Sequence, residues 1–254
     1  MTTGRSLKYV APNVVTCVGL VFGLLSIAAS FRGDAIAAGW FIVMGVIVDK
    51  VDGTLARRLN ASSAFGEQMD SLADLVTFGV APAVMFLGHM NSLPGIVDGA
   101  PSWFSAYAYT CAFSFSVAGA LRLARFNVMS SSYGHEYFFG TPVPMSGVLI
   151  ALVLMIFDKY GVDPSWYRWV PVIYVLMAFT MVSNIPLPKV KPLRNPVANV
   201  FFVANIILVH LMGITWFLVP EEWLWPEYLL ACLIVYFVVG ATAAQLKGVR
   251  APRA

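Results

Sequence analysis

The sequence predicts an all-α fold: a polytopic bundle of about eight transmembrane helices that forms a single membrane domain over residues 1–254. Hydrophobic residues make up 59% of the chain and charged residues only 11%, with a mean hydropathy of +0.77. Soluble domains carry roughly 25% charged residues, so this chain has too little charge to cover a soluble surface. Disorder is excluded as well, because it requires low hydrophobicity.

The predicted helices are apolar segments, each closed by polar residues, glycine or proline. A span needs roughly 20 apolar residues, and the segments cover residues 10–31, 35–58, 67–90, 103–127, 144–160, 166–186, 196–219 and 224–246. The first segment follows Arg5 and Lys8 but exceeds the roughly 7–15 apolar residues of a signal-peptide core, so we expect a retained helix.

The basic residues orient the predicted bundle. With the N-terminus inside, most of the 16 Lys and Arg residues fall at inner helix ends, and only Arg32, Lys159 and Arg168 fall on the outer side. This positive-inside bias and an even number of helices predict that both termini lie in the cytoplasm, with the protein in the cytoplasmic membrane. The net charge of +3 is therefore a topology signal, and we expect no nucleic-acid partner.

Four aspartates form the most informative pattern in the chain. Asp49 and Asp52 are three positions apart near the inner end of the second predicted helix, and Asp70 and Asp74 are four apart near the inner start of the third. Each spacing puts a pair on one helical face, and the short connection makes the two helices antiparallel neighbours. We therefore expect four carboxylates to converge at the cytoplasmic edge of the membrane.

Such a cluster needs a source of positive charge. An aspartate inside a spanning helix costs up to roughly 2.5–3.5 kcal/mol, and the nearby sequence offers only Lys50, Arg57 and Arg58 for neutralisation. Solvated interfacial charges are the alternative. Divalent cations solve the problem directly, because carboxylate-rich sites suit Mg²⁺ and Mn²⁺. The pattern thus predicts two metal ions, which in such sites stabilise both the attacking and the leaving oxygen of a phosphoryl displacement.

Small residues and one arginine flank the aspartates. Gly53 and Ala56 clear space beside the carboxylates, and Gly66 precedes a helix N-terminus, which favours anions. Helix packing through small residues is the alternative for each of them. Arg57 is a natural ligand for a diphosphate.

The pattern Asp49-x-x-Asp52-Gly53-x-x-Ala56-Arg57, followed by Gly66, Asp70 and Asp74, resembles the complete signature of the CDP-alcohol phosphotransferase family. The resemblance implies a membrane enzyme that transfers a phosphate-linked group from a CDP-alcohol to an acceptor hydroxyl and releases CMP. It also implies that the four aspartates hold the metal ions and that Asp74 is the general base. The residues that it implies for CDP binding are Asp52, Gly53, Ala56, Arg57 and Gly66.

Further segments resemble the integral-membrane phosphatidylserine synthases of that family. They are residues 12–16, 70–82, 121–127, 138–144 and 181–184, so the resemblance runs over about residues 10–191, while the last two predicted helices, 196–246, are less diagnostic. The tripeptide Met145-Ser146-Gly147 departs from the small residues expected there. The resemblance implies CDP-diacylglycerol and L-serine as substrates, phosphatidylserine as the product, and a homodimer.

Contacts to the acceptor and to the nucleotide are predicted outside the signature. Arg122 and Arg125 can hold a serine carboxylate, with topology or lipid headgroups as the alternative. Asn13 and Thr16 can face the diphosphate or the base, with a helix cap and a satisfied hydroxyl as the alternative. His135 is more typical of a loop surface than of a substrate-entry contact.

Two other functions remain open at the level of sequence. One is the same chemistry with another acceptor, glycerol phosphate or inositol phosphate, which would need a cationic pocket for the acceptor's phosphate. The other is an ion-coupled transporter, because intramembrane carboxylates also mark ion pathways. The position of the aspartates at the inner edge, rather than the midplane, argues against a transporter.

Overall fold

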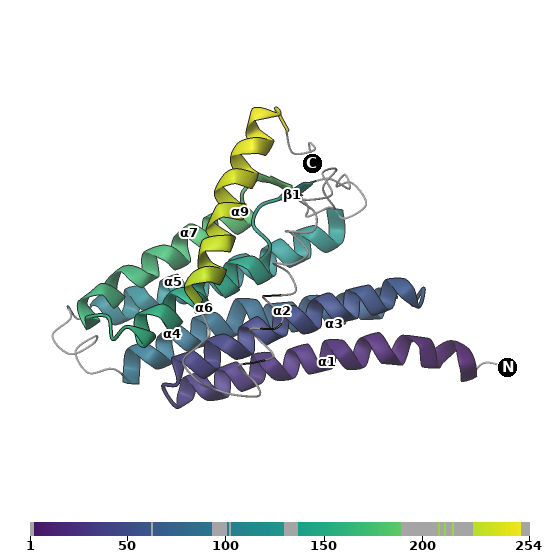
Figure 1. The fold of residues 1–254 in the computed structure, drawn as a ribbon, viewed down its shortest axis with the longest axis horizontal. Coiled ribbons are helices and arrows are strands. Elements are labelled where there is room, and N and C mark those ends of the chain that lie inside the picture. Colours follow the sequence, from purple (N-terminus) through teal and green to yellow (C-terminus); the bar gives the residue numbers. More distant parts are fainter. Residues whose placement is uncertain are drawn as a thin grey trace.

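The computed structural model describes residues 3–61, 63–92, 101, 103–129, 137–188, 208, 211, 215 and 226–249. Within these residues the chain is a bundle of helices, with α1 (Thr3–Phe31) along one side and α9 (Pro226–Leu246) on the opposite side (Figure 1). Most of the predicted helix 196–219 lies outside the described residues, as do His135 and most of the connection 91–102.

The first two helices form an antiparallel hairpin. α1 (Thr3–Phe31) and α2 (Ala35–Arg58) pack side by side along their lengths (Figure 1). Gly33 turns the chain between them with a left-handed φ of +72°, a conformation that glycine adopts without strain. The Asp34 side chain then caps α2 by accepting the backbone N–H of Ala37 at 2.9 Å. The tight turn brings the C-terminal end of α2 back beside the first half of α1.

The third predicted helix is one continuous rod with an irregular centre. α3 (Ala64–Asp74), the π-helix η1 (Leu75–Val80) and α4 (Ala81–Ser92) follow one another without a break. Ser63 caps the rod by accepting the N–H of Gly66 at 3.0 Å. The wider π turn begins directly after Asp74, and π-helical turns are frequent at functional sites.

Pro82 provides a physical reason for the π turn. Proline has no N–H, so the carbonyl of Phe78 lacks the donor that an α-helix would place four residues later. The backbone of Phe78 instead lies against Gly147 of α6 (Val143–Lys159), where an added Cβ would collide with it. The hydroxyl of Ser116 on α5 (Trp103–Met129) donates to the neighbouring carbonyl of Gly79 at 2.9 Å.

The remaining elements complete the bundle. They are α5 (Trp103–Met129), β1 (Tyr137–Phe139), α6 (Val143–Lys159), the 3₁₀-helix η2 (Pro164–Trp169), α7 (Val170–Val182), β2 (Pro186–Pro188) and α9 (Pro226–Leu246). β1 and β2 pair antiparallel, with Phe138 opposite Leu187, in a ribbon that the all-α prediction did not include. Prolines at both ends of β2 remove backbone donors, which keeps the ribbon short.

Much of the exposed surface is apolar. The buried core includes Trp40, Phe86 and Tyr174, while helices α1, α5, α7 and α9 leave many large hydrophobic side chains exposed. Among the described residues, four segments are long and apolar enough to cross a membrane, namely Val10–Phe31, Ala64–Ser92, Trp103–Met129 and Pro226–Leu246. The predicted helical membrane fold is therefore confirmed. The number of eight spans and the cytoplasmic position of the termini stay predictions.

Candidate metal and nucleotide site

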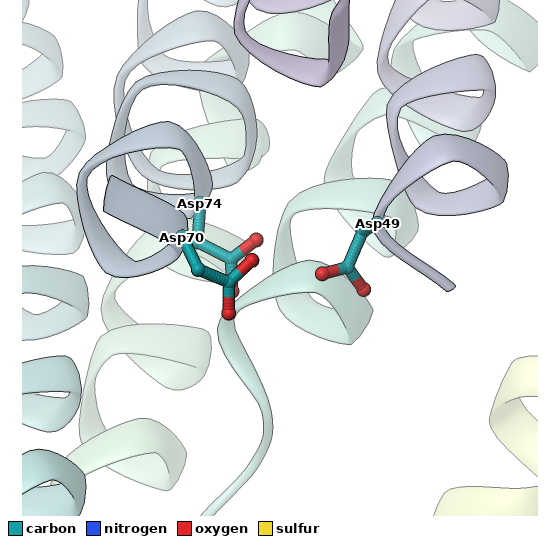
Figure 2. Close-up of side chains that lie close together, drawn as sticks. All are labelled: Asp49, Asp70 and Asp74. Carbon is teal, nitrogen blue, oxygen red and sulfur yellow. The ribbon is translucent and has the colours of Figure 1, made fainter. Parts of the chain in front are cut away.

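Three of the four predicted aspartates face one another across two helices. Asp49 projects from α2 toward Asp70 and Asp74 on α3 (Figure 2). One carboxylate oxygen of each lies within 4.8 Å of the others, and all three side chains are half-buried. The four-residue spacing on α3 and the antiparallel course of α2 produce this convergence, as the sequence predicts.

The fourth aspartate lies beside this group and is held by a different helix. Asp52 is buried, with 6% of its surface exposed, and its Oδ2 accepts a hydrogen bond of 2.8 Å from the Thr16 hydroxyl of α1. That hydroxyl also lies 3.1 Å from the carbonyl of Pro12. Because a hydroxyl has a single proton, the shorter contact to the carboxylate is the stronger one. Thr16 thereby orients Asp52 at the edge of the cluster.

The donor set of this cluster fits a divalent cation. All its ligand atoms are carboxylate oxygens, which Mg²⁺, Mn²⁺ and Ca²⁺ prefer. Lys50 and Arg57 are the cations that act on Asp49, and Arg122 acts on Asp74. Within the described residues the cluster thus gathers more negative than positive charge, and a bound cation would relieve the repulsion.

A cavity of about 170 Å³ opens beside the aspartates between α1, α2 and α3. Its walls include every residue predicted to bind CDP, namely Asn13, Thr16, Asp52, Gly53, Ala56, Arg57 and Gly66, and also Asp70. Pro12, Ala61, Ser63 and Glu67 line it as well and were not predicted to bind CDP; Pro12 comes from α1, and the other three lie between signature positions.

The glycines in this cavity permit close approaches. A Cβ at Gly66 would lie 3.2 Å from Oδ1 of Asn13 and 3.2 Å from Oγ of Ser63, so glycine lets α1 approach the start of α3. A Cβ at Gly53 would lie 3.4 Å from Nη1 of Arg57. The Arg57 side chain is exposed and its Nη2 donates to Thr54 at 3.3 Å, which places a cation at the mouth of the cavity.

The two predicted acceptor arginines lie in one small cavity but differ in their contacts. Both line it, together with Phe126 and the β1 strand. Arg122 is buried, with 7% exposed, and its charge acts on Asp74. Arg125 instead donates to backbone carbonyls: Phe139 at 3.2 Å, Val182 at 3.0 Å and Ser183 at 3.2 Å. Its guanidinium joins β1 to the end of α7.

One hydrogen bond between α3 and α5 was not predicted from the sequence. Ser71, which sits between the two α3 aspartates, receives a hydrogen bond of 2.9 Å from the Asn127 amide of α5. Its own hydroxyl lies 3.0 Å from the carbonyl of Glu67 in the preceding turn. Asn127 falls in a segment that carried the family resemblance, but its partner is 56 positions away and no sequence spacing reveals it.

The fold and the site define the class of protein. The sequence model of the CDP-alcohol phosphatidyltransferase family matches residues 9–185, which include both the aspartate cluster and the cavity beside it. This chain belongs to that family.

Several proteins with known names are similar in sequence to this chain. A Helicobacter pylori (strain ATCC 700392 / 26695) protein is 32% identical over 187 residues, which cover 73% of this chain and 75% of that protein. A Bacillus subtilis (strain 168) protein is 31% identical over 71% of this chain and 90% of its own length. A Methanocaldococcus jannaschii protein is 26% identical over 90% of both chains. All three are named CDP-diacylglycerol–serine O-phosphatidyltransferase.

Proposed function

We propose that this chain is an integral-membrane enzyme that transfers the phosphatidyl group of CDP-diacylglycerol to the hydroxyl of L-serine, giving phosphatidylserine and CMP. The observation that carries the proposal is the placement of the carboxylate cluster directly beside the cavity that holds all the predicted CDP-binding residues. The names of the relatives support serine as the acceptor.

The reaction exchanges one phosphorus–oxygen bond for another. The serine oxygen forms a bond to the lipid-linked phosphorus, the bond from that phosphorus to the bridging oxygen of the diphosphate breaks, and the bridging oxygen leaves with CMP. Asp74 accepts the proton of the serine hydroxyl as general base. The chain contributes mainly by positioning the reactants, as is common in phosphoryl transfer.

The aspartates are proposed to hold the cofactor. Asp49, Asp52, Asp70 and Asp74 would bind divalent metal, Mg²⁺ or Mn²⁺, with two ions per site. When bound, the ions supply positive charge that neutralises the diphosphate and the developing charge on the attacking and leaving oxygens.

The nucleotide is proposed to occupy the cavity between α1, α2 and α3. Arg57 at its mouth pairs with the diphosphate, and Gly53, Ala56 and Gly66 leave room for the cytidine beside the backbone. Asn13 and Thr16 line the α1 wall of this cavity. The acyl chains of the donor stay in the lipid.

The acceptor is proposed to bind on the side of Asp74 where Arg122 lies. Arg122 acts on Asp74 from a buried position, so a serine carboxylate held by Arg122 brings the serine hydroxyl toward the base. Arg125 supports this subsite by holding β1 and the end of α7, which form part of the same small cavity.

The membrane setting completes the proposal. Eight spans place both termini in the cytoplasm and the site at the inner face of the cytoplasmic membrane, where the donor lipid and a water-soluble acceptor meet. The distribution of Lys and Arg supports this orientation. The assembly proposed is a homodimer, as the family resemblance implies.

An acceptor panel tests the proposal. The purified full-length protein is supplied with CDP-diacylglycerol and Mn²⁺, and CMP release is measured with serine, glycerol phosphate, inositol phosphate or no acceptor. We expect release only with serine. Release with a phosphorylated acceptor instead would move the chain to another acceptor class, and no release with any acceptor would refute the transferase function.

A further inference from the structure

A single threonine lies beneath the aspartate cluster where three helices meet. Thr77 is in η1, three residues after Asp74, and only 2% of its surface is exposed. Its hydroxyl donates to the carbonyl of Gly19 on α1 at 3.2 Å. Asp70, Asp74 and Thr77 follow a spacing of four and three residues, so one face of the rod presents both carboxylates and this threonine.

Glycines on two other helices form a slot for this side chain. A Cβ at Gly23 of α1 would lie 2.5 Å from Oγ1 of Thr77, and a Cβ at Gly45 of α2 would lie 2.6 Å from its Cγ2. Both distances are too short for any real side chain. Each branch of Thr77 therefore contacts a different helix at a place where only glycine fits.

The slot is part of the floor of the aspartate site. Thr77, Gly19 and Gly45 line the same small cavity as all four aspartates, and its volume is only about 10 Å³. A water molecule needs at least roughly 10–15 Å³ measured in this way. No appreciable space separates the slot from the carboxylates. A shift of η1 against α1 or α2 would therefore also move Asp70 and Asp74, which lie on the same continuous helix.

We propose that Thr77 is a positioning residue: by filling the slot between Gly23 and Gly45 and by donating its hydroxyl to the carbonyl of Gly19, it sets how closely the α3 carboxylates approach Asp49. This inference rests on the proposed role of the aspartates as metal ligands. Asp49 reaches the cluster from α2, whereas Asp70 and Asp74 come from α3 (Figure 2). The thickness of one threonine side chain between η1 and α2 is then part of the geometry that the cation meets.

The test introduces a clash and then relieves it. Gly45→Ala adds a methyl group 2.6 Å from Cγ2 of Thr77, and Thr77→Ser removes that Cγ2. Supporting changes around metal sites typically cost about 10–100-fold in affinity, so we expect G45A to raise the Kd for Mn²⁺ about tenfold. The Kd is measured by titration of the full-length protein in detergent without substrate. The G45A/T77S double variant should return to within about threefold of the wild type, because the two changes compensate at one contact.

A second pair of variants keeps the inference testable if G45A does not fold. Thr77→Val keeps the shape and removes the hydroxyl that joins the rod to α1, so its Kd for Mn²⁺ should also rise. The matched control is Thr110→Val, because the Thr110 hydroxyl on α5 donates to the Ala106 carbonyl of its own helix. T110V should bind Mn²⁺ as the wild type does.

The outcomes separate this inference from the metal site itself. A lower thermal midpoint in G45A or T77V with an unchanged Kd for Mn²⁺ would show a purely structural role and overturn the inference. Failure of T77S to relieve G45A would overturn the contact on which it depends. Absence of saturable Mn²⁺ binding in the wild type would instead refute the proposed metal site, and the inference with it.

Discussion

Replacement of Thr16 by valine removes one hydroxyl from the nucleotide cavity and preserves the shape of the side chain. The hydroxyl donates to Asp52 at 2.8 Å, and both side chains are only 6% exposed. Water therefore has little access to replace the lost donor. A hydrogen bond to a charged group contributes about 1.5–3 kcal/mol net.

This energy converts into a measurable loss of activity. Each 1.4 kcal/mol corresponds to about tenfold, so T16V should lower kcat/KM for CDP-diacylglycerol roughly 10- to 100-fold. The assay is serine-dependent CMP release over a range of CDP-diacylglycerol concentrations. Thr16→Ser keeps the hydroxyl and should retain most of the activity.

The control for this substitution is again Thr110→Val, which removes a hydroxyl that bonds to the Ala106 carbonyl of the same helix at 2.7 Å. T110V should match the wild type in kcat/KM. A T16V enzyme within about twofold of T110V would refute the conclusion that the Thr16 hydroxyl orients Asp52, since it would correspond to less than about 0.5 kcal/mol.

Three further predictions concern the cluster and the acceptor subsite. Asp74→Asn should abolish turnover and leave binding of CDP-diacylglycerol largely intact, because it removes the proton acceptor; near-normal turnover would contradict the base assignment. Asp49→Asn should shift the Mn²⁺ activation curve to higher concentrations by about tenfold or more, and an unchanged curve would argue against Asp49 as a ligand. Arg122→Ala should raise KM for serine, whereas Arg125→Ala should mainly lower the thermal midpoint, because it removes the donor to the carbonyls of Phe139, Val182 and Ser183. The reverse pattern would exchange the two roles.

The aspartate cluster was predictable because it depends on residues that lie close together in the sequence. Spacings of three and four residues place each pair on one helical face, and a short connection forces the two helices together. Asp49, Asp70 and Asp74 converge as expected. The position of Asp52 was harder to predict from the sequence, because its carboxylate is oriented by a hydrogen bond from the Thr16 hydroxyl of another helix, 36 positions away.

Features that depend on backbone irregularity or distant partners could not be predicted. Apolar periodicity describes residues 67–90 as one ordinary helix and carries no signal for the π turn at Leu75–Val80. The partners of Arg125 are carbonyls, which every residue has, so composition cannot identify them. The same holds for the ribbon of β1 and β2, whose three-residue strands are too short for an alternating pattern.

The most direct test of the proposed function measures the incorporation of labelled serine into phosphatidylserine. Full-length protein is incubated with CDP-diacylglycerol, Mn²⁺ and isotopically labelled serine, and labelled phosphatidylserine and CMP are both quantified. The proposed reaction predicts that they appear in a one-to-one ratio, and that D74N forms neither. CMP release without labelled lipid, or equal product formation by D74N, would contradict transfer to serine with Asp74 as the base.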